Sequence, residues 1–131
     1  MELRQHALQI LGIADYEQKV AQTLAMQALV ATYSIADAAP VRAADAPPLP
    51  GLPARPLLVR HNEVAQRSPA SLEGRAILIH AIAHIEFNAI NLALDAIWRF
   101  DAMPRSYYLD WLRVAIEEAQ HFNLLRAHLR T

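Results

Sequence analysis

Apolar and polar residues alternate with a helical period in the second half of the chain. At about 100° per residue, five apolar side chains of residues 71–100 fall within about 40° of Glu86. These five are Ile79, Ile82, Ile90, Ala93 and Ile97. Ser71 is a good N-cap residue, and Glu73 places a carboxylate in the first turn, where it complements the helix dipole. The pattern predicts one long helix over residues 71–100.

A second long helix is predicted over residues 104–130. Four apolar side chains fall within about 40° of Glu118, and His121 lies about 60° away. The four are Trp111, Val114, Leu125 and Leu129. Pro104 suits the first turn of a helix, where its missing N–H costs nothing. Because only the turn 101–104 separates the two helices, we expect them to be antiparallel neighbours.

The first half of the chain divides into two regions. Residues 1–39 predict a short helix of about ten residues, then a break at Gly12, then a longer helix capped by Asp15 and ending near Asp37. Residues 40–70 hold seven of the eight prolines and cannot form a regular helix. Since this stretch also contains several leucines, we interpret it as a strap packed over the helices. The whole chain, residues 1–131, is expected to form one domain.

Composition favours an all-α fold and excludes several classes of protein. Hydrophobic residues make up 54% of the chain and charged residues 19%, which excludes an intrinsically disordered protein. Alanine and leucine, both strong helix formers, number 25 and 18. The chain has no cysteine, so a disulfide scaffold, a thiolate nucleophile and a zinc–thiolate site are excluded.

Charge and hydropathy patterning limit the expected partners and location. The net charge is −1 and no basic stripe is present, so we expect no nucleic-acid partner. No uninterrupted apolar run reaches about 18 residues, so we expect no membrane partner. The N-terminus lacks the apolar segment of a secretion signal, and we therefore expect a cytoplasmic protein.

The two glutamates centred in apolar stripes are the candidate functional residues. An isolated carboxylate in an apolar stripe would pay several kcal/mol of desolvation, so each needs a partner. Glu118 and His121 form a Glu-x-x-His motif, whose two side chains project from one helix face and can ligate one metal ion. A Glu on one helix with Glu-x-x-His on another is typical of carboxylate-bridged di-iron and di-manganese bundles. Pairing of Glu86 with an arginine or with His121, without metal, explains the pattern equally well.

Other chemistry-bearing residues form no convincing site. A polar face opposite Glu86 contains two histidines four residues apart, but its aspartate lies too far along the helix to join them. Its members are His80, His84, Asn88, Asn91 and Asp95. We interpret this set as a polar face turned toward the strap or solvent. His61 and Glu63 lie in the strap with no element to fix them, and Glu117 is predicted to be solvated. The aromatic residues Tyr107, Tyr108 and Trp111 are interpreted as core or interface anchors.

Five ordered motifs stand out in the second half of the chain, with a sixth upstream. The five are EGRA (73–76), HAIAHIE (80–86), AINLALD (89–95), DWLRVA (110–115) and EEAQHF (117–122), and the sixth is GLPARP (51–56). Together they resemble an uncharacterised bacterial ferritin-like family, distantly similar to the tRNA-hydroxylase and rubrerythrin groups. The resemblance implies a ferritin-like helical bundle, here a half-bundle, and an iron or manganese site. It places Glu86, Glu118 and His121 at metal-ligand positions.

Members of that family are about twice as long, and their second half supplies another Glu and another Glu-x-x-His. The resemblance therefore implies that this chain is a short member, a truncated product or a fragment. We expect a homodimer to supply the absent ligands. The alternative is a monomer in which the N-terminal helices and the strap cover the apolar stripes.

Three functions follow as hypotheses. The first is a metal-dependent oxidoreductase, and the second a non-catalytic helical module that associates with itself or a partner. The third, a tRNA-modifying activity, is disfavoured because no basic patch is present. The substrate is not predicted.

Overall fold

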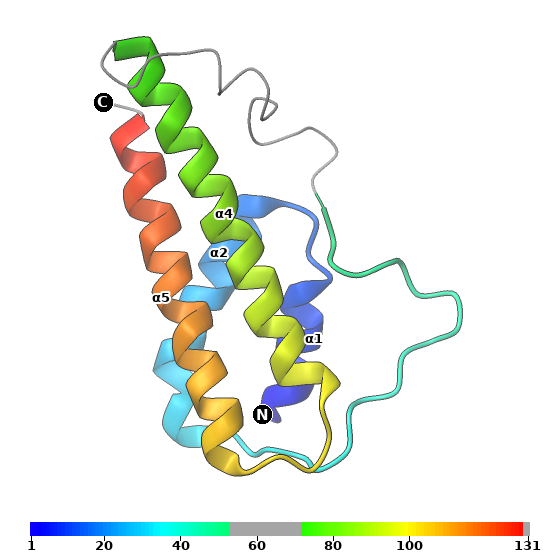
Figure 1. Cartoon of the computed structure of the whole chain (residues 1–131). Helices are drawn as coiled ribbons and strands as arrows, with labels where there is room; N and C mark the ends of the chain where they lie inside the picture. The colour runs from blue at the N-terminus through cyan, green and yellow to red at the C-terminus, as the bar shows by residue number, and fades with distance from the viewer. Residues whose placement is uncertain (53–71, 130–131) are drawn as a thin grey trace.

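Two long antiparallel helices form the frame of the molecule (Figure 1). The computed structural model describes residues 1–52 and 72–129, and across these ranges it is all-helical, with no strand. Helix α4 spans Leu72–Arg99 and helix α5 spans Arg105–Leu129. Both agree with the predicted ranges to within one residue at each end, and Glu73 lies in the first turn of α4 as expected. The proposed cap at Ser71 lies outside the described residues.

The turn between α4 and α5 is held by Tyr108. Its hydroxyl donates to the carbonyl of Phe100 at 2.7 Å and accepts from the amide of Met103 at 3.1 Å. Ala102 adopts the left-handed conformation, with φ of 55°, and its amide donates to the carbonyl of Asp37 at 2.8 Å. The turn is therefore fixed both by α5 and by the N-terminal half of the chain.

The N-terminal helices cover one face of the α4–α5 pair (Figure 1). Helix α1, Leu3–Leu11, packs on α4, and helix α2, Tyr16–Ala25, packs on α5. The Asp15 carboxylate accepts from the amide of Gln18 at 2.8 Å, which confirms the predicted N-cap. Buried apolar residues from all four helices form one core, which includes Leu3, Ile10, Val20, Phe87, Leu94, Leu112 and Phe122.

The predicted helix from Asp15 to Asp37 is wrong in its second half. The chain tightens into a 3₁₀-helix, η1, over Met26–Thr32, and Tyr33 is extended. Val30, Thr32 and Tyr33 are β-branched or aromatic residues, which are weak helix formers. The extended backbone lets the Tyr33 hydroxyl reach Nδ1 of His6, at 2.5 Å, in the core. A tertiary contact thus ends the helix earlier than its composition suggests.

The start of the proline-rich segment docks on the junction of α1 and α2. The amide of Gly51 donates to the carbonyl of Leu11 at 2.9 Å, and a Cβ at Gly51 would lie only 2.4 Å from the carbonyl oxygen of Gly12. The described part of the predicted strap, residues 40–52, therefore contacts the junction of α1 and α2, and the strap over residues 40–70 stays a prediction. Residues 53–71, including His61 and Glu63, lie outside the described residues.

Helix α4 buries only part of its apolar surface. Ile90, Ala93 and Ile97 of the predicted stripe are buried, but Ile82 is exposed. A second stripe is exposed as well, and comprises Leu78, Ile85 and Leu92. Ile82 is exposed because α1 and α2 leave that side of α4 uncovered.

Among the described helices, α4 alone is long and apolar enough to cross a membrane. Within residues 73–99, a window of 18 residues has a mean hydropathy of 1.5. A core helix of a soluble protein passes the same test, and α4 packs on both α1 and α5. The finding is weak evidence for a membrane, and the absence of a membrane partner stays a prediction.

Candidate metal centre

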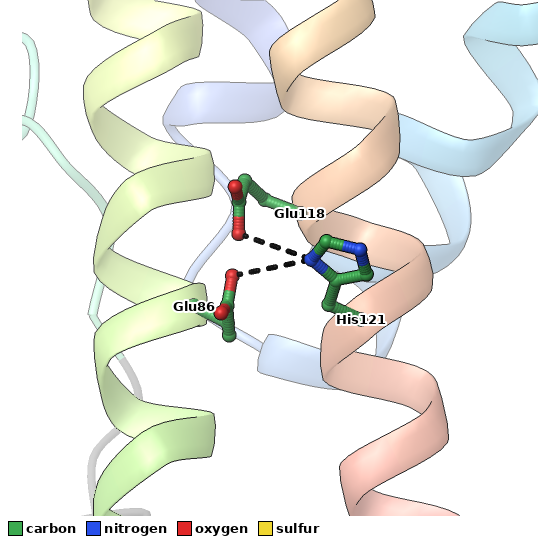
Figure 2. Close-up of side chains that lie close together, drawn as sticks. All are labelled: Glu86, Glu118 and His121. Carbon is green, nitrogen blue, oxygen red and sulfur yellow. Dashed lines mark ion pairs between the residues drawn. The ribbon is translucent and has the colours of Figure 1, made fainter.

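Glu86, Glu118 and His121 meet in the space between the two long helices (Figure 2). Nδ1 of His121 lies 3.8 Å from a carboxylate oxygen of Glu86 and 3.7 Å from one of Glu118. One ligand atom from each residue lies within 4.8 Å of the other two. The structure therefore brings together, from two helices, the three residues that the sequence predicted as ligands.

Helix geometry and small side chains explain this meeting. Glu118 and His121 are three residues apart, so both project from the same side of α5. Glu86 lies at the matching level of α4, because the two helices are antiparallel and joined by a short turn (Figure 2). Nearby positions on both helices are alanines, Ala83, Ala115 and Ala119, and all are buried. Small residues let two helix axes approach closely, which shortens the gap that the ligands span.

The three side chains are only partly shielded from water. Glu86 and Glu118 expose 21% and 23% of their side-chain surface, whereas His121 exposes 55%. Both carboxylates thus lie at the edge of the core, and the imidazole lies farther out, next to solvent. The cluster is open to solvent on the side that α1 and α2 do not cover (Figure 2).

The donor set fits a divalent transition metal. Two carboxylates and one imidazole suit manganese, iron and zinc, and the chain has no cysteine to favour a softer ion. Two ligands at about 2.1 Å from one ion are at most about 4.2 Å apart, so only small side-chain rotations are needed from the observed separation. Three protein ligands leave positions open for water or for further protein groups.

Without a metal, the same cluster can act as a hydrogen-bonded or ionic group. A protonated His121 would lie close to both carboxylates and balance part of their charge. Ion pairs of this exposure contribute little stability, typically about 1 kcal/mol or less. The geometry therefore permits both of the explanations that the sequence left open.

The polar face opposite Glu86 does not form one site. Asp95 pairs with Arg99 through two contacts of 2.7 and 2.9 Å, and Asn91 is buried and bonded to Lys19. His84 is exposed, and Nδ1 of His80 is buried without a hydrogen-bond partner among the described residues. The interpretation as a polar face turned toward the strap or solvent is therefore wrong for Asn91, which lies in the core beside Lys19, whereas His84 and Asn88 are exposed.

Two further predictions for side chains are confirmed. Glu117 is exposed, as expected for the solvated neighbour of Glu118. Tyr108 is buried in the core, and the Tyr107 hydroxyl donates to the carbonyl of Ala96 at 3.1 Å. The Tyr107 ring also packs edge-on against Trp111. The three aromatic residues therefore anchor the start of α5 to the end of α4.

Sequence reasoning missed two fully buried cations. Arg4 donates to the carbonyls of Ile97 and Trp98 at the end of α4, to those of Ala36 and Asp37, and to the carboxylate of Asp101. The helical spacing of Arg4 with the buried Leu3, Ala7 and Leu11 was a signal for its burial.

Lys19 is the second buried cation and has no carboxylate partner in the described structure. Its Nζ donates to Asn91 Oδ1 at 2.7 Å and to the carbonyl of Gly51 at 2.8 Å, above the Phe87 ring. Burial lowers the pKa of Lys19 to about 8 because a charged amine loses its hydration there. Lys19 shares a helix face with Val20 and Thr23, which are also buried. That shared spacing was the available signal.

Fold and site together define an all-helical protein with a carboxylate–histidine cluster between two long antiparallel helices. The chain belongs to a family described as "Protein of unknown function (DUF455)", which matches residues 12–131. This confirms the prediction of an uncharacterised family.

An uncharacterized protein from Haemophilus influenzae (strain ATCC 51907 / DSM 11121 / KW20 / Rd) is 52% identical to this chain over 86 residues. The aligned part covers 60% of this chain and 30% of that relative, so the chain spans less than a third of the curated relative's length. No solved structure matches the chain significantly.

Proposed function

We propose that this chain is a ferritin-like protein that binds iron or manganese through Glu86, Glu118 and His121. The supporting observation is the meeting of one Glu from α4 with a Glu-x-x-His pair from α5. That arrangement is half of the ligand set that carboxylate-bridged di-metal bundles use. The sequence resemblance to ferritin-like proteins points to the same ligands. A redox-active metal held there would supply oxidoreductase chemistry.

The residues of this chain have separate roles in that proposal. Glu86 and Glu118 supply two negative charges that offset the charge of a divalent ion at the edge of the core. His121 binds a metal only in its neutral form, so protons and metal compete for its imidazole. Because His121 is the most exposed of the three, it lies on the route by which an ion would enter.

Titration of the metal-free protein with Mn²⁺, followed by the electron paramagnetic resonance signal of the free ion, tests the proposal. We expect the wild type to suppress that signal. Loss of a residue that merely supports a ligand costs about tenfold in affinity, so Glu118→Gln or His121→Ala should cost at least about tenfold. His84→Ala, at an exposed histidine on the opposite side of α4 from Glu86, is the control.

The alternative function is a non-catalytic helical module whose cluster stays free of metal. The observation that favours it is the closeness of His121 to both carboxylates, which gives each acid a partner. In that case the wild type and the ligand variants leave the Mn²⁺ signal equally unchanged. Elemental analysis of protein purified without chelator then finds no stoichiometric iron, manganese or zinc.

A further inference from the structure

An exposed apolar stripe on α4 follows the spacing of a helix–helix seam. Its members recur at alternating intervals of four and three residues, which is the pattern that lets two helices pack along a narrow contact. They are Leu78, Ile82, Ile85, Ala89 and Leu92. Ile85 and Leu92 are 64% and 63% exposed, Leu78 and Ile82 are also exposed, and Ala89 is half-buried. We call these five residues the α4 seam.

The α4 seam and the open side of the ligand cluster belong to the same face of the helix pair. The seam is centred about 80° to one side of Glu86, and His121 and Leu124 lie about 60° and 120° to the corresponding side of Glu118. Because the helices are antiparallel, these directions lead to one common face. The opposite sides carry Phe87 and Leu112, which are buried under α1 and α2.

The common face has the size of a stable protein interface. Helices of 28 and 25 residues are about 40 Å long and about 10 Å wide each, so the face measures roughly 800 Å². A standard interface buries about 800 Å² on each partner. On α5 the face also carries the exposed acidic residues Asp110 and Glu117, so its apolar contact is provided by the α4 seam.

We propose that a second copy of this chain covers the face and completes the ligand cluster. This inference rests on the proposed function. In a two-fold dimer both copies use the same surface patch, so the two α4 seams pack on each other when the two-fold axis passes between them. If the copies cross with their α4 helices antiparallel, every neighbouring pair in the resulting four-helix bundle is antiparallel. The second copy then brings its own Glu86, Glu118 and His121 to the open side, for a total of four carboxylates and two imidazoles.

Sedimentation of the full chain tests whether the seam holds a second copy. We expect a dimer for the wild type and a monomer of unchanged helicity for Ile85→Lys. Val41→Lys introduces the same charge at an apolar residue that is 97% exposed and lies off the seam, so it should remain a dimer. A wild type that is monomeric at about 100 µM with Mn²⁺ present overturns the proposal, as does an Ile85→Lys variant that remains dimeric. A monomeric wild type that pellets with phosphatidylglycerol vesicles also overturns it, and assigns the seam to a lipid surface.

Cross-linking locates the contact independently. The chain has no cysteine, so Ile85→Cys introduces its only thiol. Ile85 is the midpoint of the seam, and its two copies lie close together whichever way the helices cross. We expect Ile85→Cys to form a disulfide-linked dimer under mild oxidation much faster than Val41→Cys. Equal rates for the two variants contradict a seam-to-seam contact.

Metal binding by the monomeric variant separates the two proposals. Ile85→Lys keeps all three ligands of its own chain but lacks the partner's, so it should bind Mn²⁺ at least about tenfold more weakly than the wild type. If it binds Mn²⁺ as the wild type does, the shared centre is overturned and metal binding within one chain stands. A dimeric wild type that binds no Mn²⁺ overturns the proposed function and the shared centre together.

Discussion

Arg4 and Lys19 are buried by different chemistry. The Arg4 guanidinium has enough acceptors for its donors, including the carboxylate of Asp101 at 2.6 Å. Lys19 lies between an amide oxygen and a backbone carbonyl, with no carboxylate in contact among the described residues. The first cation binds segments together, whereas the second carries a desolvation cost that its two hydrogen bonds only partly offset.

We expect Arg4→Met to lower the free energy of unfolding by about 3 to 5 kcal/mol. The substitution leaves carbonyls at the end of α4 and at residues 36–37 without their donor. Urea unfolding followed by circular dichroism measures the change. Arg113→Met is the control, since the pair of Arg113 with Asp110 is exposed and 3.5 Å long, and it should change stability by less than about 0.5 kcal/mol. Similar midpoints for both variants would contradict the role given to Arg4.

The Asp101 carboxylate predicts a loss of stability in acid. Hydrogen bonds from the Arg4 side chain and from the amide of Ala39 lower the pKa of Asp101 below its ordinary value of 3.8. The folded state therefore binds this proton less tightly, and the contribution is present above about pH 4 and lost as the pH falls through the lowered pKa. Asp101→Asn should reduce the slope of stability against pH below 4. An unchanged slope would show that other groups cause the acid sensitivity.

The burial of Lys19 predicts a change of stability at alkaline pH. Its pKa falls from 10.5 to about 8, so the unfolded chain binds this proton more tightly than the folded one. Stability should therefore rise with pH between about 8 and 10. Tyr33, whose pKa burial raises to about 12, opposes this trend only above pH 10. This rise in stability should disappear in Lys19→Met, and urea midpoints at pH 7.5 and 9.5 measure it. A rise that persists in the variant would count against a buried, charged Lys19.

At the scale of elements, Gly51 and Gly12 form a matched pair for substitution. A Cβ at Gly51 would lie 2.4 to 2.9 Å from backbone atoms of Gly12 and Ile13, whereas one at Gly12 meets nothing closer than 3.6 Å. Gly51→Ala should therefore displace the docked segment and lose its hydrogen bonds to Leu11 and Lys19. Gly12→Ala should leave stability unchanged or raise it by up to about 1 kcal/mol. Hydrogen exchange at the amide of Gly51 and thermal unfolding report the difference, and equal effects would contradict this docking geometry.

The elements best predicted from the sequence are those set by local rules. Asp15 and the spacing of apolar residues in 71–100 and 104–130 mark helices without reference to the rest of the chain. The change to 3₁₀ geometry at Met26 was not predictable in this way. It depends on the burial of Tyr33 against His6, a contact between residues 27 apart in sequence.

At the scale of the whole molecule, the candidate site was predictable where it follows helix geometry. The spacing of Glu118 and His121, and their pairing with Glu86, follow from two antiparallel helices. Helix geometry does not show which stripe of α4 is covered, because this depends on α1 and α2, which shield only one side of the pair. The exposure of Ile82 and the opening of the cluster on the other side therefore depend on how α1 and α2 pack against the helix pair.

Removal of residues 1–11 should abolish cooperative unfolding, even though the family match begins at residue 12. These residues supply α1, which packs on α4, and Arg4, which binds the end of α4. A chain starting at Gly12 would expose the apolar surface that α1 covers. We expect it to show reduced helicity and a broad thermal transition. A sharp transition at the wild-type temperature would show that residues 12–131 fold alone.

The burial of Lys19 also determines how the protein responds to amine-reactive reagents. Lys19 is the chain's only lysine and has no exposed surface, so no other side-chain amine of the chain reacts in its place. An acylating reagent should modify Lys19 only when Gly51 and α2 separate. The rate of this modification, read by intact mass, then measures the opening of this segment.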